Sequence, residues 1–159
     1  MTFSIRQATK NDMPRVLELI KELAVFEKEP DAVEIGVIDL EKAAFDSPKQ
    51  CTCFVADCAG MVEGIALVYH RFSTWKGSIL HLEDLIVSQR QRGSGMGTAL
   101  LDAVVKHGHG LGVKRISWEV IDWNEPAINF YKKKGADVKR DWDIVHLNED
   151  GINKYISNI

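Results

Sequence analysis

The fold of this chain is decided by a glycine-rich stretch in its middle, Val87-Ser88-Gln89-Arg90-Gln91-Arg92-Gly93-Ser94-Gly95-Met96-Gly97-Thr98. A pattern typical of a strand precedes it, and a pattern typical of a helix follows it. Closely spaced glycines let backbone N–H groups approach a ligand without interference from Cβ atoms. The start of a helix adds unpaired N–H donors, and Arg90 and Arg92 add charge for bidentate contacts. The stretch therefore predicts a turn that binds phosphate.

Three nucleotide-binding patterns compete for this turn. A P-loop requires a Lys between its last glycine and a Ser or Thr, whereas Thr98 follows Gly97 directly. A dinucleotide-binding fold has G-x-G-x-x-G in its first strand–helix unit, whereas this turn lies in mid-chain with the spacing G-x-G-x-G. The pattern Arg-x-x-Gly-x-Gly is met by Arg92, Gly95 and Gly97. Taken alone, it is also compatible with a glycine-rich loop that binds nothing.

The flanking sequence predicts a mixed sheet covered by helices. Strands are expected at residues 3–8, 52–58, 61–72, 78–88 and 115–121, with two more in 136–147. Helices are expected at 13–26, 40–45, from Thr98 onward, and at 124–134. Regular alternation in 78–88 would divide the strand between two faces, with Leu80, Leu82, Asp84 and Ile86 on one and His81, Glu83, Leu85 and Val87 on the other. An antiparallel meander followed by crossover units indicates an α/β fold of mixed α+β type.

Length and composition limit the class of protein. The chain has 159 residues, of which 45% are hydrophobic and 27% charged, which predicts one globular domain over residues 1–159 and excludes a collagen-like chain. Its three cysteines do not suggest a disulfide framework, and no residues have the spacing of a metal site. We find no pattern of a signal peptide or a membrane span. A cytoplasmic protein with no membrane partner is expected.

The net charge of −3 conceals an uneven distribution. Residues 27–46 contain seven acids and two bases, whereas residues 88–115 and 132–140 each contain five bases and one acid. This asymmetry predicts an anionic ligand at one place and a cationic ligand at another, with solvated charged surfaces as the alternative. An isoelectric point near 5.9 and the lack of a long basic stripe argue against nucleic acid as a partner.

Two further motifs accompany the glycine-rich turn. Leu82-Glu83-Asp84 precedes it, and residues 122–136 read Asp-Trp-Asn-Glu-Pro-Ala-Ile-Asn-Phe-Tyr-Lys-Lys-Lys-Gly-Ala. In this order, the three motifs resemble the GCN5-related N-acetyltransferase (GNAT) superfamily over residues 3–147. The segment Ser73-Thr74-Trp75-Lys76-Gly77 is similar to the diamine and thialysine acetyltransferase branch. The resemblance implies a homodimer and a mostly antiparallel sheet of about six or seven strands, splayed between the fourth and fifth and flanked by about four helices.

The resemblance also implies acetyl-CoA as the cofactor. The backbone of Leu85, Ile86 and Val87 is expected to bond the pantetheine and the acetyl carbonyl. Asn124 is expected to cap its helix and, with Tyr131, to contact CoA. The pyrophosphate is expected to lie in the turn formed by Arg92, Gly93, Ser94, Gly95, Met96, Gly97 and Thr98.

The amine that accepts an acetyl group has to lose a proton first. An alkylammonium has a pKa near 10.4, so about one molecule in a thousand or fewer is unprotonated at pH 7. By resemblance, Glu83 is the base, directly or through a water, with Asp84 as the alternative. Regular alternation would let only one of the two face the cleft. Tyr131 is by resemblance the acid that protonates the leaving thiolate, with a core aromatic as the alternative.

Substrate contacts also follow from the resemblance. Glu27, Glu83 and Asp84 are expected to meet a cationic amine, and Trp75 is a further candidate, with a packed aromatic as the alternative. A spermidine/spermine enzyme would be expected to have an acid just before Trp75, where Ser73-Thr74 stands. This favours thialysine, a lysine-like amino acid or a diamine over a long polyamine. The alternative functions are a protein or peptide N-acetyltransferase and a non-catalytic acetyl-CoA-binding module.

Overall fold

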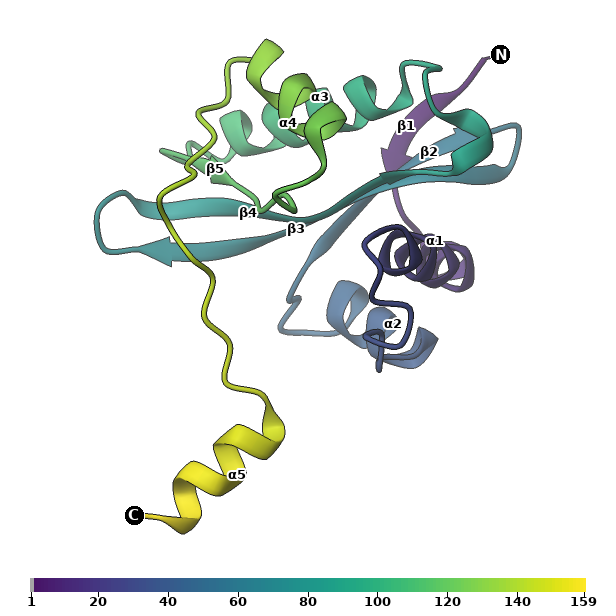
Figure 1. The fold of residues 1–159 in the computed structure, drawn as a ribbon. Coiled ribbons are helices and arrows are strands. Elements are labelled where there is room, and N and C mark those ends of the chain that lie inside the picture. Colours follow the sequence, from purple (N-terminus) through teal and green to yellow (C-terminus); the bar gives the residue numbers. More distant parts are fainter. Residues whose placement is uncertain (1) are drawn as a thin grey trace. The chain divides into compact units, whose positions relative to one another are not determined.

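The computed structural model of the protein describes residues 2–159. The chain divides into two compact units, Met1–Glu119 and Val120–Ile159. The first contains the sheet and three α-helices, and the second contains two α-helices (Figure 1). The single domain expected over residues 1–159 stays a prediction.

One sheet of five strands forms the centre of the first unit. Its strands lie in the order β1 (Ser4–Gln7), β2 (Thr52–Cys58), β3 (Met61–Ser73), β4 (Gly77–Val87) and β5 (Ile116–Ser117). The first four strands are antiparallel, and β4 and β5 form a parallel pair. This is the mixed, mostly antiparallel sheet that the sequence predicts, and the bounds of β2, β3 and β4 agree to within about a residue.

Helices cover both faces of this sheet. The helices α1 (Met13–Phe26) and α2 (Val37–Phe45) lie on one face, and α3 (Met96–Gly110) lies on the other (Figure 1). The approach to α1 is fixed by Asp12, which accepts hydrogen bonds from the Thr9 N–H and hydroxyl at 2.6 and 2.9 Å. Apolar residues of α1 and α2 form a core with inward side chains of β2, β3 and β4. We call this side of the sheet the α1/α2 face.

Strand β4 contains a bulge at Glu83. In the ladder with β3, Leu82 lies opposite Val68 and Asp84 lies opposite Leu67, so Glu83 has no partner residue. An extra residue of this kind changes the phase of side-chain alternation along a strand. The regular alternation expected over residues 78–88 is therefore wrong beyond Leu82.

Strand β5 is shorter than the sequence predicts for residues 115–121. Its ladder with β4 comprises only Leu80 opposite Ile116 and His81 opposite Ser117. From Leu82 to Val87, β4 continues beyond this ladder. The implied splay between the fourth and fifth strands is thus present, and we call this part of β4 its open edge.

The second unit contains α4 (Glu125–Lys133) and α5 (Glu149–Ser157). The two strands expected within residues 136–147 are wrong, because the structure has no strand there and the side chains of Trp142, Ile144 and Val145 are exposed. A strand needs a neighbour to bond its backbone, and apolar alternation alone does not supply one. The described residues therefore contain five strands and five α-helices, instead of about six or seven strands and about four helices.

Candidate active site

The bulge places Glu83 and Asp84 on the same face of the sheet. Asp84 lies opposite Leu67, which belongs to the core beneath α1 and α2. Glu83 Oε2 is 3.6 Å from Nε2 of His81, and His81 lies opposite Tyr69, which packs against that same core. Both carboxylates are therefore on the α1/α2 face. The expectation that only one could face a cleft is wrong, because it assumed an unbroken alternation.

A third carboxylate, Glu27, joins these two at the end of α1. Burial raises the pKa of Glu27. Burial, followed by the charges of Glu83 and Glu27, raises the pKa of Asp84 to about 6. We call Glu27, Glu83 and Asp84 the acidic cluster. A cation placed among them would relieve the charge repulsion that adds to the effect of burial on the pKa of Asp84.

Two neighbouring side chains surround Glu83. His81 is buried, its Nδ1 lies 3.3 Å from Ser117 Oγ, and its ring lies 5.0 Å from that of Tyr69. Burial and the charge of Glu83 raise the pKa of the Tyr69 hydroxyl. The Glu83 side chain itself is 53% exposed. Glu83 thus lies beside the His81 ring and the Tyr69 hydroxyl while remaining open to solvent. The sequence did not indicate these two neighbours.

The open edge of β4 presents backbone groups to the splay. The Ser88 N–H donates to the Glu63 carbonyl at 2.8 Å, and Ile86 lies opposite Ile65. Hydrogen bonding alternates along an antiparallel ladder, so Ile86 is directed toward β3. Leu85 and Val87 are directed away from β3, toward the open edge. Leu85 and Val87 therefore have the orientation that a backbone contact to a ligand needs, and the contacts expected of Leu85, Ile86 and Val87 stay predictions.

The glycine-rich turn has an open backbone. Gly93 and Gly95 have φ angles of +79° and +90°, and a Cβ atom on either would meet no atom within 4 Å. Gly95 is the N-cap of α3, which has neither a side-chain cap nor an acid in its first turn. The first N–H groups of this helix therefore have no side-chain cap, as at helix starts that bind phosphate.

The two arginines of the turn have different surroundings. The Arg90 guanidinium bonds the Glu63 carboxylate, so the charge expected to contact phosphate is already engaged. The Arg92 guanidinium lies 5.0 Å from the centre of the ring of Phe26, the last residue of α1. Arg92 is thus the arginine of the turn that lies at the end of α1.

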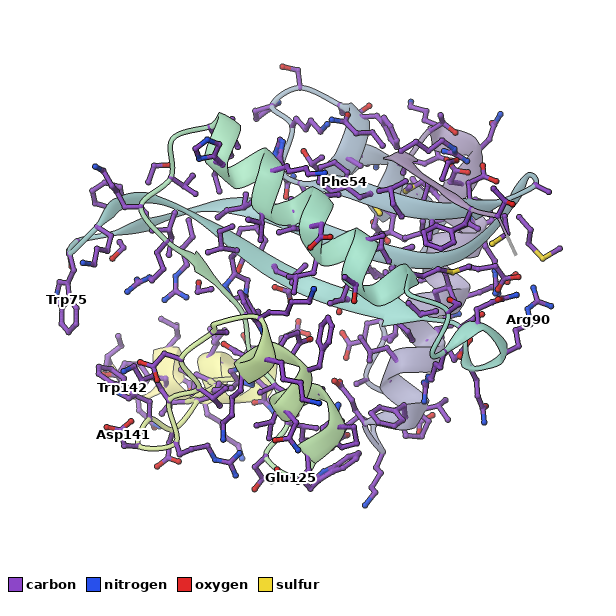
Figure 2. The ribbon with its side chains drawn as sticks, turned by 90° about the horizontal axis from the view of Figure 1, so that it is seen from above. Phe54, Trp75, Arg90, Glu125, Asp141 and Trp142 are labelled. Atoms are coloured by element: carbon purple, nitrogen blue, oxygen red, sulfur yellow. The ribbon has the colours of Figure 1, made fainter. Side chains whose placement is uncertain are left out.

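Trp75 does not join the acidic cluster. It lies in the turn between β3 and β4, is 77% exposed, and is at the opposite end of β4 from Arg90 (Figure 2). At about 3.4 Å per residue, the start of β4 is roughly 20 Å from Glu83. The contact expected between Trp75 and the substrate stays a prediction.

Asn124 and Tyr131 belong to the second unit. Asn124 Oδ1 accepts the Ala127 N–H at 3.3 Å, so the predicted cap of α4 is present. Tyr131 is buried, and its ring lies 5.3 Å from that of Phe130. Their expected roles toward CoA and the leaving thiolate stay predictions.

Comparison with known proteins identifies relatives over most of the chain. The model of the acetyltransferase (GNAT) family matches residues 13–136. Thialysine N-epsilon-acetyltransferase of Bos taurus is 34% identical over 140 residues, which cover 83% of this chain and 82% of the relative. Spermidine/spermine N(1)-acetyltransferase-like protein 1 of Homo sapiens is 30% identical over 158 residues, 93% of this chain and 23% of that protein.

Solved structures share the fold. An integron cassette protein from the mobile metagenome of V. cholerae superposes with a TM-score of 0.79 at 23% identity, covering 98% of both chains. An aminoglycoside acetyltransferase from an uncultured soil metagenomic sample superposes with a TM-score of 0.75 at 17% identity, covering 92% of this chain and 97% of that one. Among residues 2–159, no helix combines the length and apolar character required to cross a membrane.

Proposed function

Because this chain belongs to the GNAT acetyltransferase family and is an N-acetyltransferase, we propose that it transfers the acetyl group of acetyl-CoA to a primary amine of a small cationic substrate. The acidic cluster beside the open edge of β4 carries this proposal, because three carboxylates favour a cationic acceptor. The names of two relatives, which include thialysine and spermidine/spermine, point to the same chemical class.

The chain has residues suited to hold acetyl-CoA. The open backbone of Gly93 and Gly95 and the start of α3 suit the pyrophosphate, with Arg92 as the charged side chain nearby. Leu85 and Val87 can offer backbone groups to the pantetheine at the open edge of β4. Bound there, acetyl-CoA would supply a thioester as the acetyl donor.

Glu83 is the proposed base. Its half-exposed carboxylate can take a proton from the substrate ammonium, directly or through one water, and so free the nitrogen lone pair. Asp84 is less exposed and has a raised pKa because of burial, Glu83 and Glu27. Because Asp84 is less exposed than Glu83, we assign it, together with Glu27, to holding the ammonium. Its raised pKa favours proton acceptance near neutral pH and keeps Asp84 as the alternative base.

Tyr131 is the proposed acid. A phenol with a pKa near 10 can donate its proton to a thiolate whose conjugate acid has a pKa near 8.5. Tyr131 lies two turns into α4, the helix that Asn124 begins, within the third motif of the family resemblance. Its hydroxyl would protonate the sulfur that leaves the acetyl group.

The test is thiol release from acetyl-CoA with a panel of amines: thialysine, lysine, putrescine, spermidine and a lysine-containing peptide. We expect the shorter amines to be turned over faster than spermidine, and the peptide to be the poorest acceptor. Fastest turnover of the peptide would instead assign the chain to protein acetylation. Tight CoA binding without thiol release from any amine would contradict the proposal.

A further inference from the structure

A second glutamate, Glu63, occupies a bulge in the sheet. In the ladder of β2 with β3, Asp57 lies opposite Val62 and Ala56 lies opposite Gly64, so Glu63 has no partner residue. Its side chain is only 3% exposed, and it is the one charged residue in the apolar run 61–68. Burying a carboxylate is unfavourable unless it is paired and hydrogen-bonded. Hydrophobic packing therefore does not account for the buried carboxylate of Glu63.

The partners of Glu63 come from the segment that enters the glycine-rich turn. Ser88 Oγ donates to Glu63 Oε2 at 2.6 Å, and Arg90 Nε donates to the same oxygen at 3.1 Å. Arg90 Nη2 also pairs with Glu63 Oε1. These hydrogen bonds more than offset the effect of burial, so the pKa of Glu63 is lowered and the group is ionised at neutral pH.

Helix α1 completes this anchor from the other side. Arg15 Nη2 lies 3.7 Å from Glu63 Oε2, and Glu22 accepts the Gln89 N–H at 2.8 Å. Three consecutive residues at the start of the turn, Ser88 to Arg90, are therefore held by side chains of β3 and α1. The glycines that follow have an open backbone and no side chains of their own to fix it.

We propose that Glu63 is a positioning residue that pre-organises the glycine-rich turn for acetyl-CoA, and that Arg90 serves this anchor and not the phosphates. The inference rests on the proposed function, because it assumes that the turn binds the pyrophosphate. A turn held in its binding conformation loses less entropy when the ligand binds. Glu63 therefore acts on cofactor affinity and leaves the chemical step unchanged.

The experiment measures the Kd of CoA by calorimetry, and kcat and both KM values by thiol release, in the full chain. Glu63→Val should raise the Kd of CoA and the KM of acetyl-CoA about tenfold. At saturating acetyl-CoA, kcat and the KM of the amine should stay within about twofold. Glu63→Gln keeps an acceptor for Ser88 and should restore most of the affinity.

Arg6 provides the matched control. Its guanidinium bonds Asp12 at 2.8 Å and Asp57 at 2.8 Å, which joins β1 and β2 at the opposite edge of the sheet from β4. Arg6→Met removes a comparable ion-pair network and should lower the melting temperature without changing the Kd of CoA. The double variant Glu63→Val with Arg90→Met removes the whole pair, and because the Arg90 side chain is 58% exposed, this variant should bind CoA no more tightly than Glu63→Val alone.

The outcomes separate this inference from the proposed function. Wild-type affinity in Glu63→Val, or in the double variant, would overturn the positioning role while leaving the acetyltransferase proposal intact. An equal loss of affinity in Arg6→Met would also overturn it, because general destabilisation would then explain the effect. Failure of the wild-type chain to bind CoA would overturn both.

Discussion

At the scale of single residues, the acidic cluster forms because Glu83 is the extra residue of the bulge in β4. Glu83 and Asp84 are adjacent in the sequence and share a face of β4, where Glu27 adds a third charge. Such crowding is unfavourable in the free protein and becomes favourable once an ammonium lies among the carboxylates. The cluster therefore exchanges folding stability for affinity toward a cation.

The stability consequence can be measured with Asp84→Asn. A pKa raised from 3.8 to about 6 means that the folded protein binds the proton more tightly, so stability decreases as pH rises through this window. Two pKa units correspond to about 3 kcal/mol, and the variant should gain about 1–3 kcal/mol in the free energy of unfolding at pH 8. The gain should vanish near pH 4 in urea titrations. Asp102→Asn, an exposed control on α3, should leave the free energy of unfolding unchanged at pH 8 and at pH 4.

The assignment of base and anchor can be separated by pH–rate profiles. Glu83→Gln should lower kcat about a hundredfold at pH 7 and recover partly as pH rises, because more of the amine is then unprotonated. Asp84→Asn should mainly raise the KM of the amine. The reverse pattern, in which Asp84→Asn loses the rate and Glu83→Gln alters only KM, would make Asp84 the base.

The sequence predicts candidate site residues where they belong to a motif. It does not predict which side chains surround those residues in the fold. The glycine-rich turn and the Asn124 cap follow from local sequence, because each depends on neighbouring backbone. Glu63 lies in an apolar strand pattern that gives no sign of its partners, 25 and 27 residues away. Those contacts depend on strand register, which alternation alone does not determine when a bulge is present.

At the scale of elements, the connection from β4 to α3 combines a fixed entry with an open turn. Gly95 has a positive φ and begins the helix, so it affects both the backbone conformation and the space above it. An L residue in this region costs about 1–2 kcal/mol. A side chain here would also project into the space proposed for the pyrophosphate.

Gly95→Ala should therefore raise the Kd of CoA at least about tenfold, as measured by calorimetry. Gly60→Ala provides a control with nearly the same backbone strain, because its φ is +89° and a Cβ there would also meet no atom within 4 Å. The control lies in the β2–β3 turn and should lose a similar amount of stability while binding CoA normally. Equal binding by both variants would contradict the placement of the pyrophosphate.

Elements with local determinants were predicted well, and elements that depend on a partner were not. The bounds of helix α1 and of strands β2 to β4 agree with the predicted ranges. Strand β5 ends early because β4 and β5 diverge, and the apolar side chains at 142–145 lack a neighbouring strand. Helix α5 was missed although Asn148 caps it by accepting the Gly151 N–H at 2.9 Å, since an expected strand reached Leu147.

At the scale of the molecule, several charged side chains of the acidic and basic segments form ion pairs or lie in the acidic cluster. The acid-rich segment 27–46 begins at the acidic cluster, whereas in the basic segment 88–115 Arg90 is neutralised by Glu63. In the segment 132–140, Lys139 pairs with Asp137 at 2.5 Å. The charge that remains to attract ligands is therefore smaller than the sequence count.

The salt dependence of the KM for a diamine tests whether the acidic segment 27–46 attracts the substrate. Screening shortens the range of electrostatic attraction to roughly 10 Å at 0.1 M ionic strength. Raising the salt from about 0.03 M to 0.3 M should increase the KM of a diamine about two- to fivefold, with little change in kcat at saturating acetyl-CoA. Glu27→Gln should reduce this dependence, and an unchanged slope in that variant would exclude Glu27 from substrate attraction.

The bulges have a consequence for how this chain can be shortened. Both bulges have a glutamate as the extra residue: Glu63 of β3 has no partner residue in the ladder with β2, and Glu83 of β4 has none in the ladder with β3. Deleting residue 83 would leave Leu82 opposite Val68 and Asp84 opposite Leu67, so every other side chain would keep its face. A chain that lacks Glu83 should fold, bind CoA and fail to acetylate an amine. Glu83 would then be an insertion that the sheet tolerates and only the reaction requires.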